Sequence, residues 1–153
     1  MIWVDADACP VKAEVERAAG RHRVPVKMVC DGGLRPSANP LVEVVYVTEG
    51  LDAADDHIAR HAGPGDVVLT NDIPLADRCL AAGAAVLRFD GEVLTTRNIA
   101  AKLAARNAAD AHRAETVAMA DDRGPRGGGR AFTDRDRGRF SNALDLALRG
   151  AAR

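Results

Sequence analysis

The sequence has few aromatic residues and no long apolar run. Phe, Trp and Tyr make up 3% of the 153 residues, and much of the apolar content is alanine. We therefore expect an aliphatic, helix-rich core. No stretch approaches the roughly 20 apolar residues that a membrane-spanning helix needs. No basic segment precedes the apolar start, as it would in a secretory signal. These absences predict a soluble protein that does not contact a membrane.

The sequence also lacks paired cysteines and a strong charge of either sign. It has three cysteines, Cys9, Cys30 and Cys79, and none of them forms a CxxC pair. An odd number of widely spaced cysteines favours reduced thiols, so we expect a cytoplasmic protein. The net charge is −1, which excludes a field of the whole protein that would attract nucleic acid. Any such contact must come from a local basic patch.

Short apolar runs alternate with helical patterns as far as Phe89. We expect strands at 2–4, 26–30, 42–47, 66–70 and 84–89, and helices at 10–20, 52–61 and 74–82. This alternation is typical of a mostly parallel sheet with helices on both faces. Further helices are expected at 96–113 and 132–148, with a flexible loop at 115–131. The length fits a single domain, 1–153, of three-layer α/β/α architecture with C-terminal helices.

Aspartates stand where three of the expected strands give way to helices. Two follow the first strand, three open the helix at 52–61, and one follows the strand at 66–70. Ligands of open α/β sheets bind outside the carboxyl ends of the strands. We therefore expect these acids to share one edge of the sheet: Asp5, Asp7, Asp52, Asp55, Asp56 and Asp72.

Each group of acids also has a purely structural interpretation. Acids in a first helical turn are stabilised by the helix dipole, by roughly 0.3–1 kcal/mol each, and Asp72 suits an N-cap before Pro74. The coincidence of three junctions favours a site for Mg²⁺ or Mn²⁺, which prefer oxygen ligands. Such a site suits phosphodiester hydrolysis. Zinc is disfavoured because the cysteines and the four histidines lack ligand spacing.

Three motifs resemble those of the YaiI/YqxD family of small bacterial proteins. They are Asp5-Ala6-Asp7-Ala8-Cys9-Pro10-Val11-Lys12, Gly50-Leu51-Asp52-Ala53-Ala54-Asp55 and Thr70-Asn71-Asp72-Ile73-Pro74-Leu75-Ala76. Asp134-Arg135-Asp136-Arg137, followed by Phe140, is similar to the last motif of that family. The resemblance covers nearly the whole chain. One departure is Gly124-Pro125-Arg126-Gly127-Gly128-Gly129-Arg130, where the family pattern has Gly-Gly-Pro.

The resemblance implies a PIN-like nuclease fold. In PIN-like nucleases clustered acids bind Mg²⁺ or Mn²⁺ and cut RNA or single-stranded nucleic acid. Carried over by motif, Asp5, Asp55 and Asp72 form the core of a catalytic metal site. Asp7 is an additional catalytic acid, and Asp52 and Asp56 are further candidate metal ligands. A homodimer is left open.

Basic residues near the expected site are candidates for binding the nucleic-acid backbone. Arg126 and Arg130 stand in the glycine-rich segment, where backbone N–H groups can approach phosphate closely. Arg135 and Arg137 continue the basic stretch, and Lys12 and Arg35 are candidates on weaker grounds. A solvated loop and helix face explain the same pattern equally well.

Two other functions fit parts of the sequence. Asp5-Ala6-Asp7 resembles the DxD motif of HAD-type phosphatases, in which Asp5 would attack phosphorus and Asp7 would act as acid and base. Thr70 resembles the second motif of that class, but no downstream lysine followed by a Gly-Asp acid motif occurs in the required order. The other alternative is a non-catalytic RNA-binding module that keeps the acids for structure.

Overall fold

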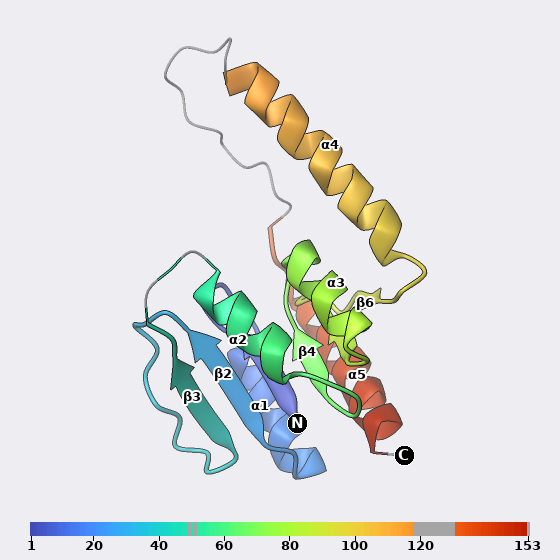
Figure 1. The fold of residues 1–153 in the computed structure, drawn as a ribbon. Helices are drawn as coiled ribbons and strands as arrows, with labels where there is room; N and C mark the ends of the chain where they lie inside the picture. Colours follow the sequence, from blue (N-terminus) through green and yellow to red (C-terminus); the bar gives the residue numbers. More distant parts are fainter. Residues whose placement is uncertain (49, 51, 118–130, 153) are drawn as a thin grey trace.

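A six-stranded sheet forms the centre of the molecule (Figure 1). The computed structural model describes residues 1–48, 50, 52–117 and 131–152. The strands are β1 (Ile2–Asp5), β2 (Val26–Cys30), β3 (Val42–Tyr46), β4 (Val67–Leu69), β5 (Ala85–Leu87) and β6 (Val93–Leu94). Their order is β3-β2-β1-β4-β5-β6. The first five are parallel and β6 runs antiparallel to β5, so the predicted mostly parallel sheet is confirmed.

Helices cover both faces of the sheet. They are α1 (Lys12–His22), α2 (Ala53–His61), α3 (Ile73–Ala81), α4 (Ile99–Val117) and α5 (Asp134–Ala151). Ile2 and Val4 of β1 pack in a core with α1 and α5. Trp3, between them, packs in a second core with α2 and α3. Side chains of a strand alternate between its faces, so this pattern produces the predicted three-layer α/β/α fold.

Several boundaries differ from those expected. The two-residue strand β6 was missed, since a strand this short leaves no periodic signal. α1 begins at Lys12, two residues after Pro10. α4 begins later than predicted, at Ile99, and continues to Val117 into the segment expected as a loop. The remainder of that segment, 118–130, lies outside the described residues. No helix among the described residues is long and apolar enough to cross a membrane.

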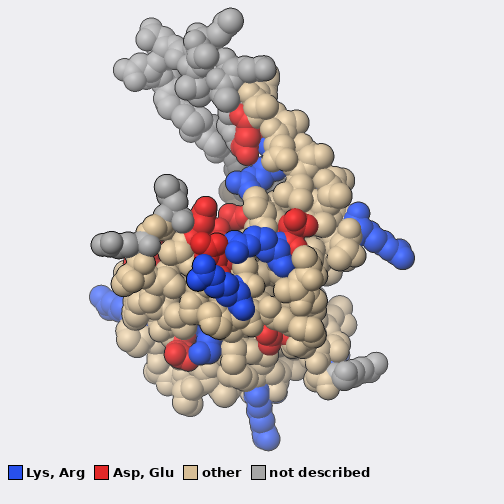
Figure 2. Space-filling model, in the orientation of Figure 1, with Lys and Arg blue, Asp and Glu red and all other residues tan. Residues whose placement is uncertain are grey.

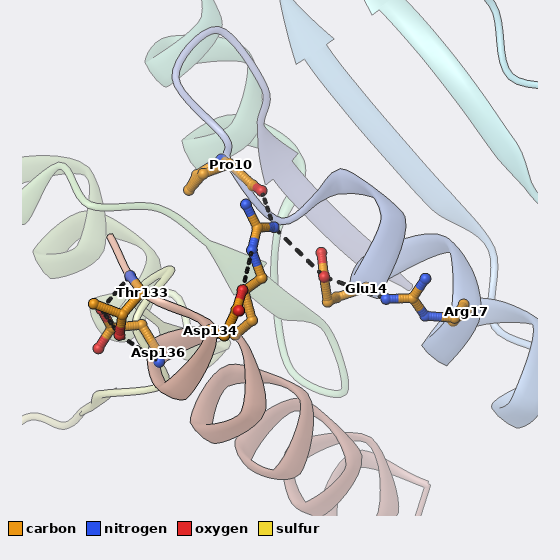
Figure 3. A network of polar contacts seen from close by, with 7 residues as sticks. Pro10, Glu14, Arg17, Thr133, Asp134 and Asp136 are labelled. Carbon is orange, nitrogen blue, oxygen red and sulfur yellow. Dashed lines mark hydrogen bonds and ion pairs between the residues drawn. The ribbon is translucent and has the colours of Figure 1, made fainter. Parts of the chain in front are cut away.

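A polar network joins the start of α5 to the segment that follows β1 (Figure 3). Thr133 and Asp136 form a capping box, in which each side chain accepts a hydrogen bond from the backbone N–H of the other. Arg137 donates a hydrogen bond to the carbonyl of Pro10 at 2.8 Å and lies 3.5 Å from the buried carboxylate of Glu14. The last helix thereby holds the loop that leads away from the end of β1.

A candidate acidic site at the switch point of the sheet

The chain changes direction across the sheet between β1 and β4. From β1 it proceeds outward to β2 and β3, whereas β4 lies on the other side of β1 and leads to β5. In open α/β sheets the crevice at such a switch point, outside the carboxyl ends of the strands, is the usual ligand site. In Figure 1 these ends and the starts of α2 and α3 lie at the top of the molecule, below α4.

Strand alternation directs Asp5 and Thr70 to the same side of the sheet. Trp3 and Val68 both pack in the core that includes α2 and α3. Asp5 is two residues beyond Trp3, and Thr70 is two residues beyond Val68. Both side chains therefore point to the α2–α3 layer. The Thr70 hydroxyl donates a hydrogen bond to Oδ2 of Asp5 at 3.1 Å, which confirms this arrangement.

Thr70 also fixes the next acid in the chain. It is fully buried, and its Oγ1 accepts a hydrogen bond from the backbone N–H of Asp72 at 3.0 Å. Asp72 is the N-cap of α3, and its Oδ1 accepts a hydrogen bond from the N–H of Leu75 at 3.0 Å. The structural interpretation of Asp72 is therefore confirmed. The N-cap role leaves the second carboxylate oxygen, Oδ2, outside this cap bond.

Asp55, in the first turn of α2, is electrostatically coupled to the other acids. Burial, followed by the charges of Asp72, Asp5 and Asp52, raises the pKa of Asp55 to about 7. The pKa of Asp5 is also raised, chiefly by burial, although the hydrogen bond from Thr70 opposes the shift. These mutual effects mean that acids from β1, α2 and the β4–α3 junction lie close to one another. The fold thus brings Asp5, Asp55 and Asp72 together at the carboxyl ends of the strands, whereas Asp7, which was expected with them, lies elsewhere.

Asp52 precedes α2 in an unusual backbone conformation. Its φ of 68° and ψ of 17° are left-handed, and its side chain makes no capping hydrogen bond to the helix. A non-glycine residue in this region carries roughly 1 kcal/mol or more of strain. Asp52 is thus the N-cap of α2 by position, but its carboxylate does not cap the helix.

Four of the aspartates, those that open α2 and the N-cap of α3, line a cleft of about 230 Å³ between α2, α3 and α4, whereas Asp5 is not among its lining residues. Figure 2 shows acidic side chains gathered at this end of the molecule with basic side chains directly beside them. Nη1 of Arg78 donates to Oδ1 of Asp56 at 2.8 Å, and Nη1 of Arg106 lies 3.9 Å from Oδ1 of Asp72. The cleft is lined by Asp52, Asp55, Asp56, Asp72, Pro74, Leu75, Arg78 and Arg106.

Asp7 lies apart from this group. Its Oδ1 accepts a hydrogen bond from the N–H of Asp31, just beyond β2, at 3.2 Å. It lines a second cleft, of about 200 Å³, with Lys12, Gly33 and other residues on the β2 side of β1. Asp7 therefore lines a different cleft from Asp55 and Asp72.

The predicted phosphate-binding residues are dispersed. Lys12 lines the second cleft, and its Nζ donates to the carbonyl of Cys9 at 2.9 Å. Arg35 is exposed in the loop after β2, and Arg135 is exposed on α5. The guanidinium of Arg137 is engaged by Pro10 and Glu14, as described above. Arg126 and Arg130 lie outside the described residues.

Three residues of the site were missing from the candidate list. Thr70 had a signal, because it directly follows a buried strand and precedes the N-cap Asp72. Arg78 and Arg106 had none, since they approach acids that are distant in sequence. Within the described part of the chain, no group of three or more His, Cys, Asp or Glu side chains already has the arrangement of a metal site.

The fold and the cleft define a class: an open α/β protein with an acidic site at its switch point. A family model described as "Uncharacterized BCR, YaiI/YqxD family" matches residues 3–150, and the chain belongs to this family. The UPF0178 proteins of Ruegeria pomeroyi and Cereibacter sphaeroides are each 53% identical over 152 residues. These matches cover 99% of the chain and 96% and 90% of the two relatives.

A UPF0178 protein of Rhodopseudomonas palustris is 47% identical over 155 residues, which cover 99% of the chain and 92% of the relative. No solved structure matches the chain. The predicted family is therefore confirmed, and the names of these relatives state no activity.

Proposed function

We propose that the protein is a metal-dependent nuclease that hydrolyses phosphodiester bonds in RNA or single-stranded nucleic acid. The observation that carries the proposal is the convergence of Asp5, Asp55 and Asp72 from three elements on one side of the switch point. Carboxylates placed together in this way repel one another, and this repulsion lowers stability while no cation is bound. The resemblance to PIN-like nucleases, drawn from the motifs, supports the same reaction class.

The acids have the chemistry of a Mg²⁺ or Mn²⁺ site. They offer only carboxylate oxygens, the ligands that these hard cations prefer. Burial and then the charges of neighbouring acids raise the pKa of Asp55 to about 7, and a divalent cation would relieve the repulsion between those charges. Asp5, Asp55 and Asp72 would hold the cation, with Asp52 and Asp56 as outer members. When bound, it would lower the pKa of a water and neutralise charge on the phosphoryl group.

Neighbouring groups of the protein orient the carboxylates of the site and shift their pKa values. Thr70 orients the carboxylate of Asp5, and the cap bond of Leu75 orients that of Asp72. Asp55, whose pKa is raised to about 7 while no cation is bound, would release its proton when a cation binds. Asp7 acts mainly through its charge, which raises the pKa of Asp5 from the other side of β1. We therefore expect Asp7 to matter less than Asp5.

The direct test is cleavage of a short RNA and a short single-stranded DNA with Mn²⁺. The wild type should cleave at least one of them, and EDTA should stop the reaction. Asp5→Asn should abolish it. Glu43→Gln, which neutralises an exposed carboxylate on the edge strand β3, should leave it unchanged. Equal cleavage by the wild type and Asp5→Asn would point to a contaminating nuclease and overturn the proposal.

Two experiments distinguish the nuclease from the alternatives, a HAD-type phosphatase and a non-catalytic RNA-binding module. A HAD-type phosphatase needs Asp5 and Asp7 at one phosphate, whereas Asp7 is bound to the N–H of Asp31 in the second cleft. Trapping of an aspartyl-phosphate on Asp5 by a phosphate-mimicking inhibitor would favour that class over the nuclease. A non-catalytic RNA-binding module would bind RNA without cleaving it, and Mn²⁺ would not raise its melting temperature.

A further inference from the structure

Two arginines line the acidic cleft. Neither belongs to the three sequence motifs that carry its aspartates. Arg78 belongs to α3 and Arg106 to α4, and both line the cleft. Each is anchored on one side, Arg78 by Asp56 at 2.8 Å and Arg106 by Asp110 of its own helix at 3.6 Å. Their side chains are nevertheless 47% and 41% exposed. Each guanidinium is thus held in place while much of it faces solvent.

α4 carries Arg106 on an extended arm. The helix is attached to the body at its first turn, where Ile99 is buried and Leu103 is partly buried in the core with α3. Residues 104–112 are all exposed. Figure 1 shows this helix projecting from the body above the starts of α2 and α3. A basic side chain on this arm therefore borders the cleft from the side opposite α2.

Stability is a weak reason for these arginines. Exposed ion pairs contribute about 0–1 kcal/mol. A guanidinium has five N–H donors in a planar fork, so a carboxylate partner leaves donors for a second anion. The fork matches the geometry of a phosphate group and binds it in a bidentate manner. A cleft lined only by acids would repel a polyanion, and the two arginines supply the opposite charge at its border.

We propose that Arg78 and Arg106 bind the phosphate groups of the substrate backbone next to the acids, a role that rests on the proposed nuclease function. The substrate strand lies in the cleft between α3 and α4 and is held by its phosphates. Recognition by phosphate contacts carries no sequence information. Binding is therefore independent of base sequence and strongly dependent on salt.

The first experiment measures binding without cleavage. Fluorescence anisotropy of a labelled short single strand is recorded in EDTA, with salt varied between about 50 and 200 mM. Arg78→Gln and Arg106→Gln should each weaken binding roughly tenfold at low salt. Each should also reduce the slope of log K against log salt by about 0.7, the value for one phosphate contact on a single strand. Arg60→Gln, which removes an exposed arginine at the far end of α2, is the matched control and should match the wild type.

A double variant separates phosphate contact from simple neutralisation of Asp56. Arg78→Gln alone leaves Asp56 unpaired, so its charge could repel the strand. Asp56→Asn/Arg78→Gln removes both charges and keeps the net charge of the wild type. If Arg78 contacts phosphate, the double variant binds as weakly as Arg78→Gln. If it regains wild-type affinity, Arg78 only neutralises Asp56 and the proposal fails for this residue.

Lysine at either position gives a further check. Arg106→Lys keeps the charge and should restore the salt slope, although its affinity stays below that of the wild type because the bidentate fork is lost. With Mn²⁺, the glutamine variants should raise KM and leave kcat within about twofold, as expected for lost uniform binding. A loss confined to kcat, with KM and the salt slope unchanged, would overturn the phosphate-binding role.

The outcomes distinguish a failure of the arginine role from a failure of the proposed nuclease function. Wild-type cleavage with unchanged affinity and salt slope in both glutamine variants overturns the arginine role alone. A wild type that neither binds nor cleaves overturns both proposals. A wild type that binds but does not cleave, with reduced salt slopes in both variants, supports the arginine role on a non-catalytic module.

Discussion

Replacing Asp55 by asparagine should stabilise the protein at neutral pH when no divalent cation is present. The pKa of Asp55 is raised from 3.8 to about 7 in the folded protein, first by burial and then by Asp72 and Asp5. The folded state therefore binds the proton more tightly than the unfolded state does. Stability from this group is fully present below pH 4, and is lost as the pH rises through about 7.

The magnitude follows from the size of the shift. One pKa unit corresponds to about 1.4 kcal/mol, so a shift to about 7 has an upper limit of about 4 kcal/mol. Because Asp55 is only partly buried, solvent screening reduces this to about 1–2 kcal/mol. Asparagine keeps the shape and removes the charge. For a chain of this length, we expect a melting temperature about 3–6 °C higher at pH 8.

The assay is urea unfolding of the wild type and Asp55→Asn in EDTA, from about pH 4 to pH 8. The difference in unfolding free energy should be near zero at the acidic end and should grow in favour of the variant as the pH rises. Mn²⁺ should reverse the order, because a cation at 100 times its Kd would stabilise the wild type by about 2.7 kcal/mol. A variant that is equally stable or less stable at pH 8 in EDTA would refute the reasoning.

Three further substitutions test the framework around the site. Thr70→Val keeps the shape but leaves the partly buried N–H of Asp72 without its acceptor and Asp5 without its donor, so urea unfolding should show a loss of about 1–3 kcal/mol. Arg137→Gln removes one of two cations beside the buried carboxylate of Glu14, since Arg17 remains 3.2 Å from it, and should lose about 1–2 kcal/mol. Unchanged stability with reduced oligonucleotide affinity would instead return Arg137 to the phosphate-binding candidates. Gly91→Ala should lose about 2 kcal/mol or more in thermal unfolding, because a Cβ there would lie 2.7 Å from the backbone of α5 and φ is 90°.

The layers of the fold were predictable because they depend on periodic patterns. Ile2, Trp3 and Val4 form a fully apolar run, which predicts a strand covered on both faces, and β1 is covered in this way. The extent of α4 was less predictable. Residues 104–112 of this alanine-rich helix are exposed, so no apolar stripe marks how far the helix continues. β6 depends on its pairing with β5, a tertiary contact that cannot be predicted from a run of two residues.

The acids of the site were predictable for a topological reason. Parallel strands end at one edge, so Asp5 and Asp72 had to be neighbours once β1 and β4 were adjacent. Which helix would bring an arginine to these acids was not predictable, because Arg78 and Asp56 are 22 residues apart in the sequence. Arg137 illustrates the opposite case. Its basic neighbours suggested an external ligand, whereas the fold supplies an internal one at Pro10.

The position at which β1 ends changes the interpretation of the first motif, which contains Asp5 and Asp7. Two acids at i and i+2 share a face only while the chain remains a strand. β1 ends at Asp5, and Asp7 lies in the turn that follows. The turn brings Asp7 toward β2, where its carboxylate accepts a hydrogen bond from the N–H of Asp31. Asp5 instead accepts a hydrogen bond from Thr70, which directly follows β4. A covalent phosphatase mechanism needs both carboxylates at one phosphorus, whereas metal-dependent hydrolysis needs Asp5 beside Asp55 and Asp72. The place where β1 stops therefore favours the second chemistry.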